Sequence, residues 1–139
     1  DVLYEKPNSS FVAQFIGENN QLKGKVKSIN GENCIITTES GDDIQALKIN
    51  VNSNGDSSLV SLRPERVAIN SSENFENNFE AKVKELIYLG DHIRSRVEVC
   101  GNDQFIVKIP NSYMGANLKE GATVKLSWKA SDSRALDLN

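Results

Sequence analysis

The sequence predicts an all-β protein, a barrel or sandwich assembled from two related β units. Apolar and polar residues alternate in segments such as 22–29 and 93–100, which is typical of half-buried strands. Turn signals recur about every 8–12 residues, a spacing typical of barrels and sandwiches. A third observation is an internal repeat, which indicates that the two halves of the chain share one structure.

The repeat is visible at two levels. Residues 22–29 (LKGKVKSI) match residues 79–86 (FEAKVKEL), and both segments continue into hairpins. Each unit then closes on a similar strand, residues 60–63 (VSLR) in the first and 125–128 (KLSW) in the second. A unit of this size buries little apolar surface alone, so we expect the two to pack together.

A short helix is predicted ahead of the first unit. Phe11, Val12, Phe15 and Ile16 fall on one helical stripe within residues 8–16, and Gly17 supplies a C-terminal stop. This apolar face is large for the length of the helix and needs a partner.

The strands follow in order, separated by turns rich in Gly, Asn and Asp. The expected strands are Leu22–Ile29, Cys34–Thr38, Ile44–Val51, Leu59–Leu62, Phe79–Leu89, Ile93–Cys100, Phe105–Ile109, Val124–Trp128 and Ser131–Leu138. Residues 70–78 are polar and rich in Asn, which indicates an exposed connection between the two units.

The stretch Ser61–Ile69 stands out because an apolar strand meets a proline between two opposite charges. Pro64 cannot donate to a sheet, so the segment is expected at an edge or a strand end. Arg63 precedes the proline and should be extended, with Arg63 and Glu65 on one face. The pair is either an incidental surface ion pair or an anchor of the barrel edge or a subunit contact.

Composition excludes several classes of protein. The chain has 139 residues, 38% hydrophobic, with a formal net charge of −3, which disfavours a nucleic-acid partner. No apolar run approaches the roughly 20 residues that span a bilayer. The start, Asp1–Lys6, is charged and is neither a Met nor a signal peptide, so we expect a piece of a longer protein. Cys34 and Cys100 are expected to be unpaired small hydrophobes rather than a disulfide.

Motifs for catalysis are missing from the sequence. There is no phosphate-binding Gly-rich loop and no dinucleotide fingerprint. His92 is the one histidine and is expected to be a turn residue. Neither metal-ligand spacing nor a nucleophile motif is present. The chain alone is therefore not expected to be an enzyme, and no cofactor or metal is expected in it.

Three short motifs, in their order and spacing, resemble the C-terminal part of ATP-binding subunits of ABC importers, the group that includes the polyamine, maltose and ferric-ion transporters. Leu3–Pro7 with Phe11–Gly17 resembles the final helix of a nucleotide-binding domain. Leu62–Val67 resembles the signature strand of the appended regulatory domain, and Leu86–His92 with Trp128 resembles its second transport-associated (TOBE) repeat. The runs 17–20 and 88–92 are most similar to the polyamine-type branch.

This resemblance implies an oligonucleotide-binding-like (OB-like) barrel domain at residues 21–139, with units at about 21–69 and 79–138. Residues 1–20 would be the terminal helix and linker of an upstream ATPase domain, where ATP and Mg²⁺ would bind. The implied role is regulation and dimerisation on the inner face of the plasma membrane, without insertion into it. The implied partners are a second ATPase subunit and the transmembrane permeases. Interface or structural roles are expected for Arg63, Pro64, Glu65, Phe11, Phe15 and Trp128.

Two other functions fit the same β pattern. One is a stand-alone barrel that binds a small ligand or an oxyanion. The other is an RNA-binding barrel, which the acidic balance disfavours, because aromatic residues are few and are not interleaved with the basic strands.

Overall fold

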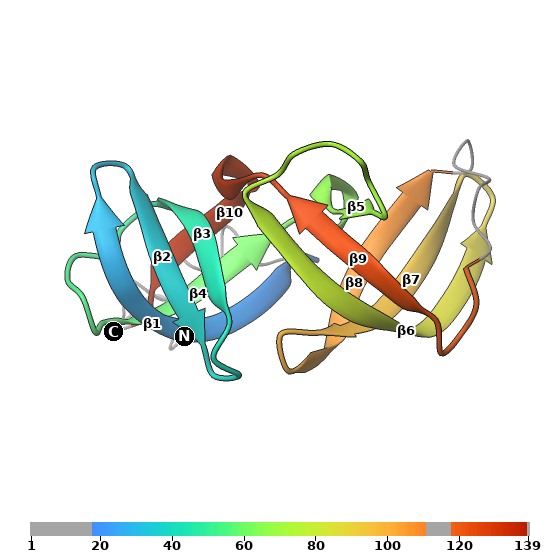
Figure 1. The fold of residues 1–139 in the computed structure, drawn as a ribbon, viewed down its shortest axis with the longest axis horizontal. Coiled ribbons are helices and arrows are strands. Elements are labelled where there is room, and N and C mark those ends of the chain that lie inside the picture. Colours follow the sequence, from blue (N-terminus) through green and yellow to red (C-terminus); the bar gives the residue numbers. More distant parts are fainter. Residues whose placement is uncertain (1–17, 111–117, 139) are drawn as a thin grey trace, which may run out of the picture.

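The protein consists of two five-stranded β sheets placed side by side along its long axis (Figure 1). The structure is a computed structural model that describes residues 18–110 and 118–138. The predicted helix at 8–16 lies outside these residues. The strands are β1 (Asn20–Asn30), β2 (Asn33–Thr38), β3 (Asp43–Lys48), β4 (Ser57–Leu62), β5 (Ala68–Ile69), β6 (Asn77–Leu89), β7 (His92–Val99), β8 (Asn102–Pro110), β9 (Thr123–Trp128) and β10 (Ser133–Asp137). The all-β prediction is confirmed.

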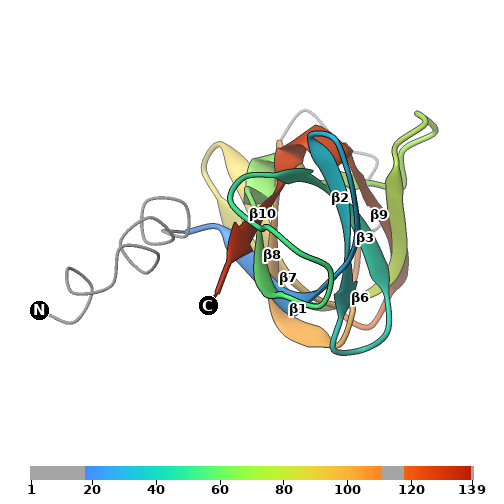
Figure 2. The ribbon, with the colours of Figure 1, turned by 90° about the vertical axis from the view of Figure 1, so that its left-hand side faces the viewer.

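The first sheet is a closed barrel with the strand order β1-β2-β3-β10-β4, and β4 returns to pair with β1. All its pairings are antiparallel except β10 with β3, which is parallel. Seen from the barrel end, the strands form a ring (Figure 2). Closure removes free sheet edges, so every strand of this barrel has two bonded neighbours.

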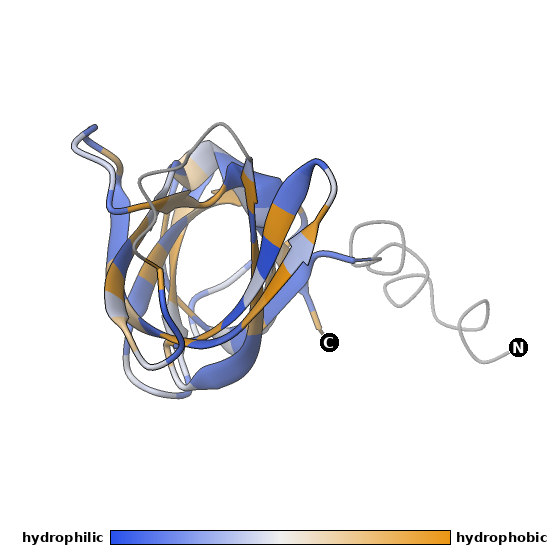
Figure 3. Ribbon diagram, turned by 90° about the vertical axis from the view of Figure 1, so that its right-hand side faces the viewer, coloured by the Kyte–Doolittle hydropathy of each residue, from blue (hydrophilic) through white to orange (hydrophobic). Residues whose placement is uncertain are grey.

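The second sheet has the order β5-β9-β6-β7-β8 and remains open, with β5 and β8 at its edges. It curves strongly, and apolar and polar residues alternate along its strands (Figure 3). This alternation places one side chain of each successive pair toward the interior, as expected for strands with one buried face.

The two units exchange strands, which the sequence pattern did not predict. β10 follows the second unit in sequence but lies in the first barrel, while β5 follows the first unit and pairs with β9 (Figure 1). A short 3₁₀ turn precedes each exchanged strand, Pro64–Arg66 (η1) and Ala130–Asp132 (η2). The residues before the turns have matching backbone angles, φ −71° and ψ 135° at Arg63 and φ −76° and ψ 145° at Lys129. The repeat is therefore structural as well as sequential.

The pairing registers align the repeat residue by residue. β1 and β6 begin at Asn20 and Asn77, which lie opposite Leu62 and Trp128 respectively. The match of residues 22–29 with 79–86 is confirmed by this alignment. The proposed match of 60–63 with 125–128 is wrong by one residue, because Leu62 and not Arg63 is the counterpart of Trp128. A slip of one residue in a strand exchanges its two faces, so the distinction matters.

The stretch Ser61–Ile69 differs from its prediction in the middle. Arg63 is extended, as expected before a proline, but residues 64–66 form a 3₁₀ turn rather than continuing a strand. Pro64 is buried. Arg63 and Glu65 form no ion pair within the part of the chain that the structure describes. The stretch is thus a corner between two sheets, and its charges lie on a turn rather than on one face of a strand.

Two strands are shorter than expected. The third ends at Lys48 instead of Val51, and the last begins at Ser133, after η2, instead of Ser131. The others match their expected positions within a few residues, because strand ends follow turn residues that are visible in the sequence.

A single apolar core runs through both sheets. Its largest fully buried side chains are Trp128, Phe105, Ile36, Ile44, Leu62 and Leu126. They come from both sheets, and Ile69 of β5 and Ala135 of β10 join the same core from the two exchanged strands. Each unit therefore depends on the other for its core, as expected for units too small to fold alone.

Candidate functional site

The two sheets meet where the β2–β3 turn touches the β7–β8 turn. Ile36 and Val97 hold equivalent positions, opposite Val26 and Val83, so Ser40 and Gly101 are also equivalent. The two turns contact each other at these residues. A Cβ on Gly101 would lie 3.0 Å from the Cβ of Ser40, and Gly101 has a φ of +76°. Only glycine fits this close approach without displacing the opposite turn.

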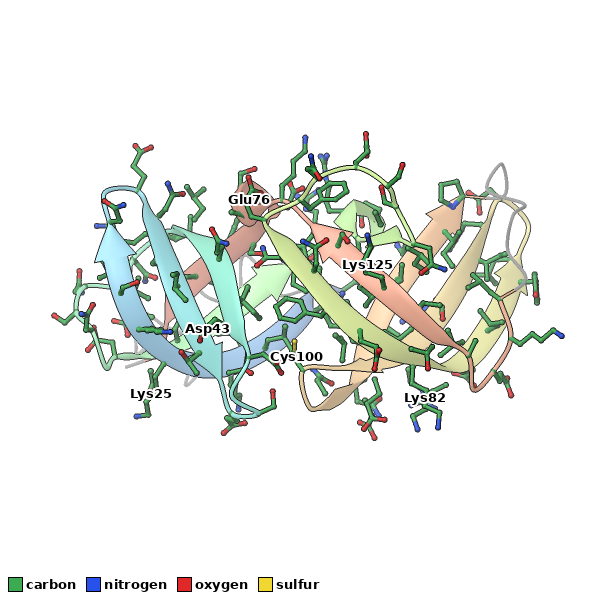
Figure 4. The ribbon with its side chains drawn as sticks, viewed as in Figure 1. Lys25, Asp43, Glu76, Lys82, Cys100 and Lys125 are labelled. Carbon is green, nitrogen blue, oxygen red and sulfur yellow. The ribbon has the colours of Figure 1, made fainter. Side chains whose placement is uncertain are left out.

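A cleft of about 480 Å³ opens beside this contact. It is lined by Gln21, Leu22, Lys23, Thr38, Glu39, Ser40, Cys100, Gly101, Asn102 and Asp103. Its residues come from both units, and Figure 4 shows Cys100 between the two sheets. An amide of one unit bridges to the other, because the Asn102 side chain donates to the Gln21 carbonyl at 3.1 Å. The cleft therefore exists only where the two units of the chain pack together.

Acidic groups outnumber basic ones at the cleft. The lining holds one cationic side chain, Lys23, and two carboxylates, Glu39 and Asp103. A further carboxylate, that of Asp42, lies next to Cys100. Burial, together with the smaller effect of the nearby Asp42 carboxylate, raises the pKa of the Cys100 thiol to about 12. The thiol is consequently protonated near neutral pH. The arrangement favours a cationic or neutral occupant over an anion.

Cys34 is buried in the first barrel, and burial raises the pKa of its thiol as well. Both cysteines are free. The expectation of unpaired cysteines is confirmed. Raised pKa values and burial make both thiols poor nucleophiles.

Two asparagines that the sequence reasoning missed bridge the two units. The Asn20 side chain accepts from the Ile106 N–H at 2.7 Å and donates to the Ile106 carbonyl at 2.7 Å. Asn77 does the same at Gln45, at 2.8 and 2.9 Å. Ile106 lies in the edge strand β8, and Gln45 lies in the part of β3 that β10 does not pair, so each amide bonds backbone groups that have no neighbouring strand there. Both side chains are buried. Each asparagine stands two residues before its copy of the repeat, a signal that was available in the sequence.

The residues singled out from the sequence do not come together in the cleft. Arg63, Pro64 and Glu65 form the corner before β5. Phe11 and Phe15 lie outside the described residues. Trp128 is fully buried in the second sheet, with its ring 5.4 Å from Phe79 and 5.9 Å from Phe105.

Trp128 also connects the two units. Its indole N–H donates to the hydroxyl of Ser133, the first residue of the exchanged strand β10. The Trp128 side chain thus packs in the core of the second sheet and also bonds the first residue of β10, the strand that closes the first barrel.

An exposed apolar group lies at the β6–β7 hairpin, away from the cleft. Ile87, Tyr88 and Leu89 are 42%, 70% and 41% exposed, and His92 nearby bonds to Asp91 at 2.7 Å. Large apolar side chains of this exposure in one place are typical of contact surfaces.

Metal and membrane features are absent from the described residues. Residues 18–110 and 118–138 contain no cluster of three or more His, Cys, Asp or Glu side chains arranged to hold a metal ion. In the same ranges, no helix has the length and apolar character needed to cross a bilayer.

Both the sequence and the fold of this chain are similar to those of known proteins. Residues 60–136 match the family model of the TOBE domain. The spermidine/putrescine import ATP-binding protein PotA of Trichodesmium erythraeum is 35% identical over 118 residues, which cover 79% of this chain and 31% of that protein. The protein of the same name from Roseobacter denitrificans is 32% identical over 96% of this chain and 38% of its own length.

The chain therefore spans about a third of the length of the curated relatives it matches. Among solved structures, the cytoplasmic molybdate-binding protein ModG, crystallised with molybdate bound, superposes with a TM-score of 0.72. That likeness covers 85% of this chain and 95% of the other, at 17% identity. At this identity it shows a shared fold.

Proposed function

This chain belongs to the TOBE domain family, and we propose that it is the regulatory and dimerisation domain of the ATP-binding subunit of a polyamine importer. The observation that supports this most is the similarity to spermidine/putrescine import ATP-binding proteins along nearly the whole chain. ATP and Mg²⁺ would bind in an upstream domain, and this chain would hydrolyse no ATP. Uptake of labelled spermidine, competed by putrescine, in cells with and without the intact subunit tests the substrate.

In the intact importer, the subunit would lie on the cytoplasmic face of the membrane and contact the permease subunits through its upstream domain. The regulatory domain would transmit contacts between two ATPase subunits. A body of two sheets with exchanged strands suits this role, because each unit contributes a strand to the sheet of the other. Bending between the units would break the bonds that β10 and β5 make.

Self-association is the part of this proposal that can be tested on the chain itself. Ile87, Tyr88 and Leu89 are three of the four large apolar side chains exposed among the described residues. We expect the chain to form dimers through this hairpin, because pairing two such groups removes apolar surface from water. Light scattering coupled to gel filtration should give twice the mass of one chain. The double variant Ile87→Ser, Leu89→Ser should give the mass of a monomer.

The matched control is Leu138→Ser, because Leu138 is the fourth exposed apolar side chain, 40% exposed, and follows the last strand. This variant should remain dimeric. A wild-type chain that stays monomeric at high concentration contradicts the proposal. A dimer that Leu138→Ser disrupts, and the hairpin variant does not, places the contact elsewhere.

The alternative of an oxyanion-binding barrel is suggested by the likeness to a molybdate-binding protein. Against it stands the lining of the cleft between the units, where two carboxylates oppose one lysine. We expect titration calorimetry with molybdate or sulfate to show no heat of binding that saturates as the anion is added. One saturable site per chain would favour the alternative over the regulatory role.

A further inference from the structure

The sequence contains two Asn-Gly pairs, and both lie in exposed turns of the first unit. Asn30-Gly31 connects β1 to β2, and Asn54-Gly55 lies in the loop before β4. The β1–β2 turn lies at the end of the first barrel away from the second sheet (Figure 1). All four residues are exposed, and the two glycines have φ values of +64° and +90°. Because the pairs share sequence, exposure and the sign of φ, any difference in their bonding can be tested by comparing them.

Asparagine followed by glycine is prone to a spontaneous reaction of its side-chain amide. Asparagine is thermolabile, and glycine has no side chain to hinder access to its own amide nitrogen. That nitrogen loses its proton and attacks the asparagine Cγ, the bond from Cγ to the side-chain nitrogen breaks, and ammonia leaves. One water then opens the resulting cyclic imide. Addition at the side-chain carbonyl gives aspartate and addition at the backbone carbonyl gives isoaspartate, so the reaction needs no oxidant or reductant.

The nitrogen that would attack in the second pair is held by a hydrogen bond. The Gly55 N–H donates to the Val26 carbonyl at 2.7 Å, and the Val26 N–H donates to the Asp56 carbonyl at 2.9 Å. The second unit has the equivalent bond, from the Gly121 N–H to the Val83 carbonyl at 2.7 Å. The Gly55 bond is thus a feature of the repeat, and it must break before the Gly55 nitrogen can react.

No such bond restrains the first pair. The pairing of β1 with β2 ends at Asn30 and Asn33, so Gly31 and the residue after it form the turn. Within residues 18–110 and 118–138, neither the Gly31 N–H nor the Asn30 side chain makes a hydrogen bond. A Cβ on Gly31 would meet no atom within 4 Å, so the space around the turn is open. Both reacting groups of the first pair are therefore available.

We propose that Asn30 is a modification site of this chain, converted in the folded protein to aspartate and isoaspartate. Asn54 has the same following residue and the same exposure but is protected, because the Gly55 N–H is bonded to Val26. The proposal needs no partner protein. It is independent of the importer role and of the proposed dimer.

Each product changes the β1–β2 turn in its own way. Aspartate adds a negative charge two residues from Glu32 in an exposed turn. Isoaspartate places an additional methylene in the main chain between Asn30 and Gly31, directly after the last β1–β2 pair. The two-residue connection then becomes longer, and we expect the Asn30–Asn33 end of the ladder to open, because loop length sets the register of a hairpin.

Timed incubation of the purified chain in warm, mildly alkaline buffer, followed by peptide mass spectrometry, tests the proposal. Trypsin cuts after Lys27, Lys48 and Arg66, so the two Asn-Gly pairs fall in separate peptides. Electron-transfer fragmentation distinguishes isoaspartate from aspartate. Products at Asn30 should accumulate about tenfold faster than products at Asn54, because the second site reacts only after its loop opens. Equal rates at the two sites, or no product at Asn30, would overturn the proposal.

Unfolding supplies the matched control, because it removes the hydrogen bond without changing the sequence. In urea that unfolds the chain, the two sites should react at similar rates. A preference for Asn30 that persists unchanged in urea would assign the difference to neighbouring residues and overturn the role of the Gly55 bond. In the folded chain, Asn30→Gln should remove the fast product, since a longer side chain must form a larger ring, and Asn54→Gln should leave it unchanged. Equal losses in both variants would also contradict the proposal.

Discussion

Replacing Gly24 by alanine is expected to destabilise the protein by about 3 kcal/mol or more. Gly24 lies in β1, opposite Thr38 of β2. A Cβ at this position would lie 2.2 Å from the carbonyl oxygen of Thr37 and 2.8 Å from its carbonyl carbon. Both are backbone atoms of β2, so the overlap can be relieved only by moving one strand away from the other. Urea unfolding followed by far-UV circular dichroism measures the loss.

Gly90→Ala is the matched control. No atom lies within 4 Å of a Cβ at Gly90, and its backbone is outside the left-handed region. Alanine at this position should change the free energy of unfolding by no more than about 0.5 kcal/mol. If both variants unfold at the same urea concentration, the barrel tolerates a side chain at residue 24 and the close approach has no energetic role.

The repeat allows Gly24 to be compared with the equivalent residue of the second unit. Its counterpart is Ala81, which lies opposite Val124 in the second sheet. The sequence shows a glycine in one copy and an alanine in the other, but it does not show why. The two positions differ in their pairing, because Gly24 is paired with Thr38 of β2, whereas the pairing of β6 with β7 begins only at Lys82 and Glu98. Which strand lies against a given residue is a property of non-local pairing, which residue periodicity does not encode.

Strands and turns could be predicted because they depend on neighbouring residues. The exchange of β5 and β10 could not, because Ser133 pairs with Leu62 and no local pattern connects two residues so far apart in the sequence. The one local feature that relates to this exchange is the corner at residues 63–66. Its proline predicts a strand edge, whereas in the structure Pro64 begins a 3₁₀ turn after which the chain enters the other sheet.

The candidate cleft was also beyond local reasoning, since turns from both units form it. The bridging asparagines were within reach. Asn20 and Asn77 occupy the same place in the two copies of the repeat, and a polar residue conserved between copies at a strand start indicates a shared structural role. Extending the repeat alignment by two residues toward the N-terminus would have identified both.

Replacing Trp128 by alanine is expected to cost about 3–5 kcal/mol, the range for removing a buried aromatic side chain. The indole is fully buried between Phe79 and Phe105, so its loss leaves a cavity in the second sheet. The substitution also leaves the Ser133 hydroxyl without its donor at the start of β10. Because Trp128 is the one tryptophan, unfolding of this variant is followed by circular dichroism rather than by fluorescence.

Two milder variants separate the packing from the link between units. Ser133→Ala removes the hydrogen bond alone and should cost about 1 kcal/mol. Trp128→Phe keeps an aromatic ring between the two phenylalanines but has no N–H, so adding Ser133→Ala to it should cost less than in the wild type. Equal costs of Ser133→Ala in both backgrounds would show that the indole does not hold β10. A loss below about 1 kcal/mol for Trp128→Ala would show that the second sheet repacks without it.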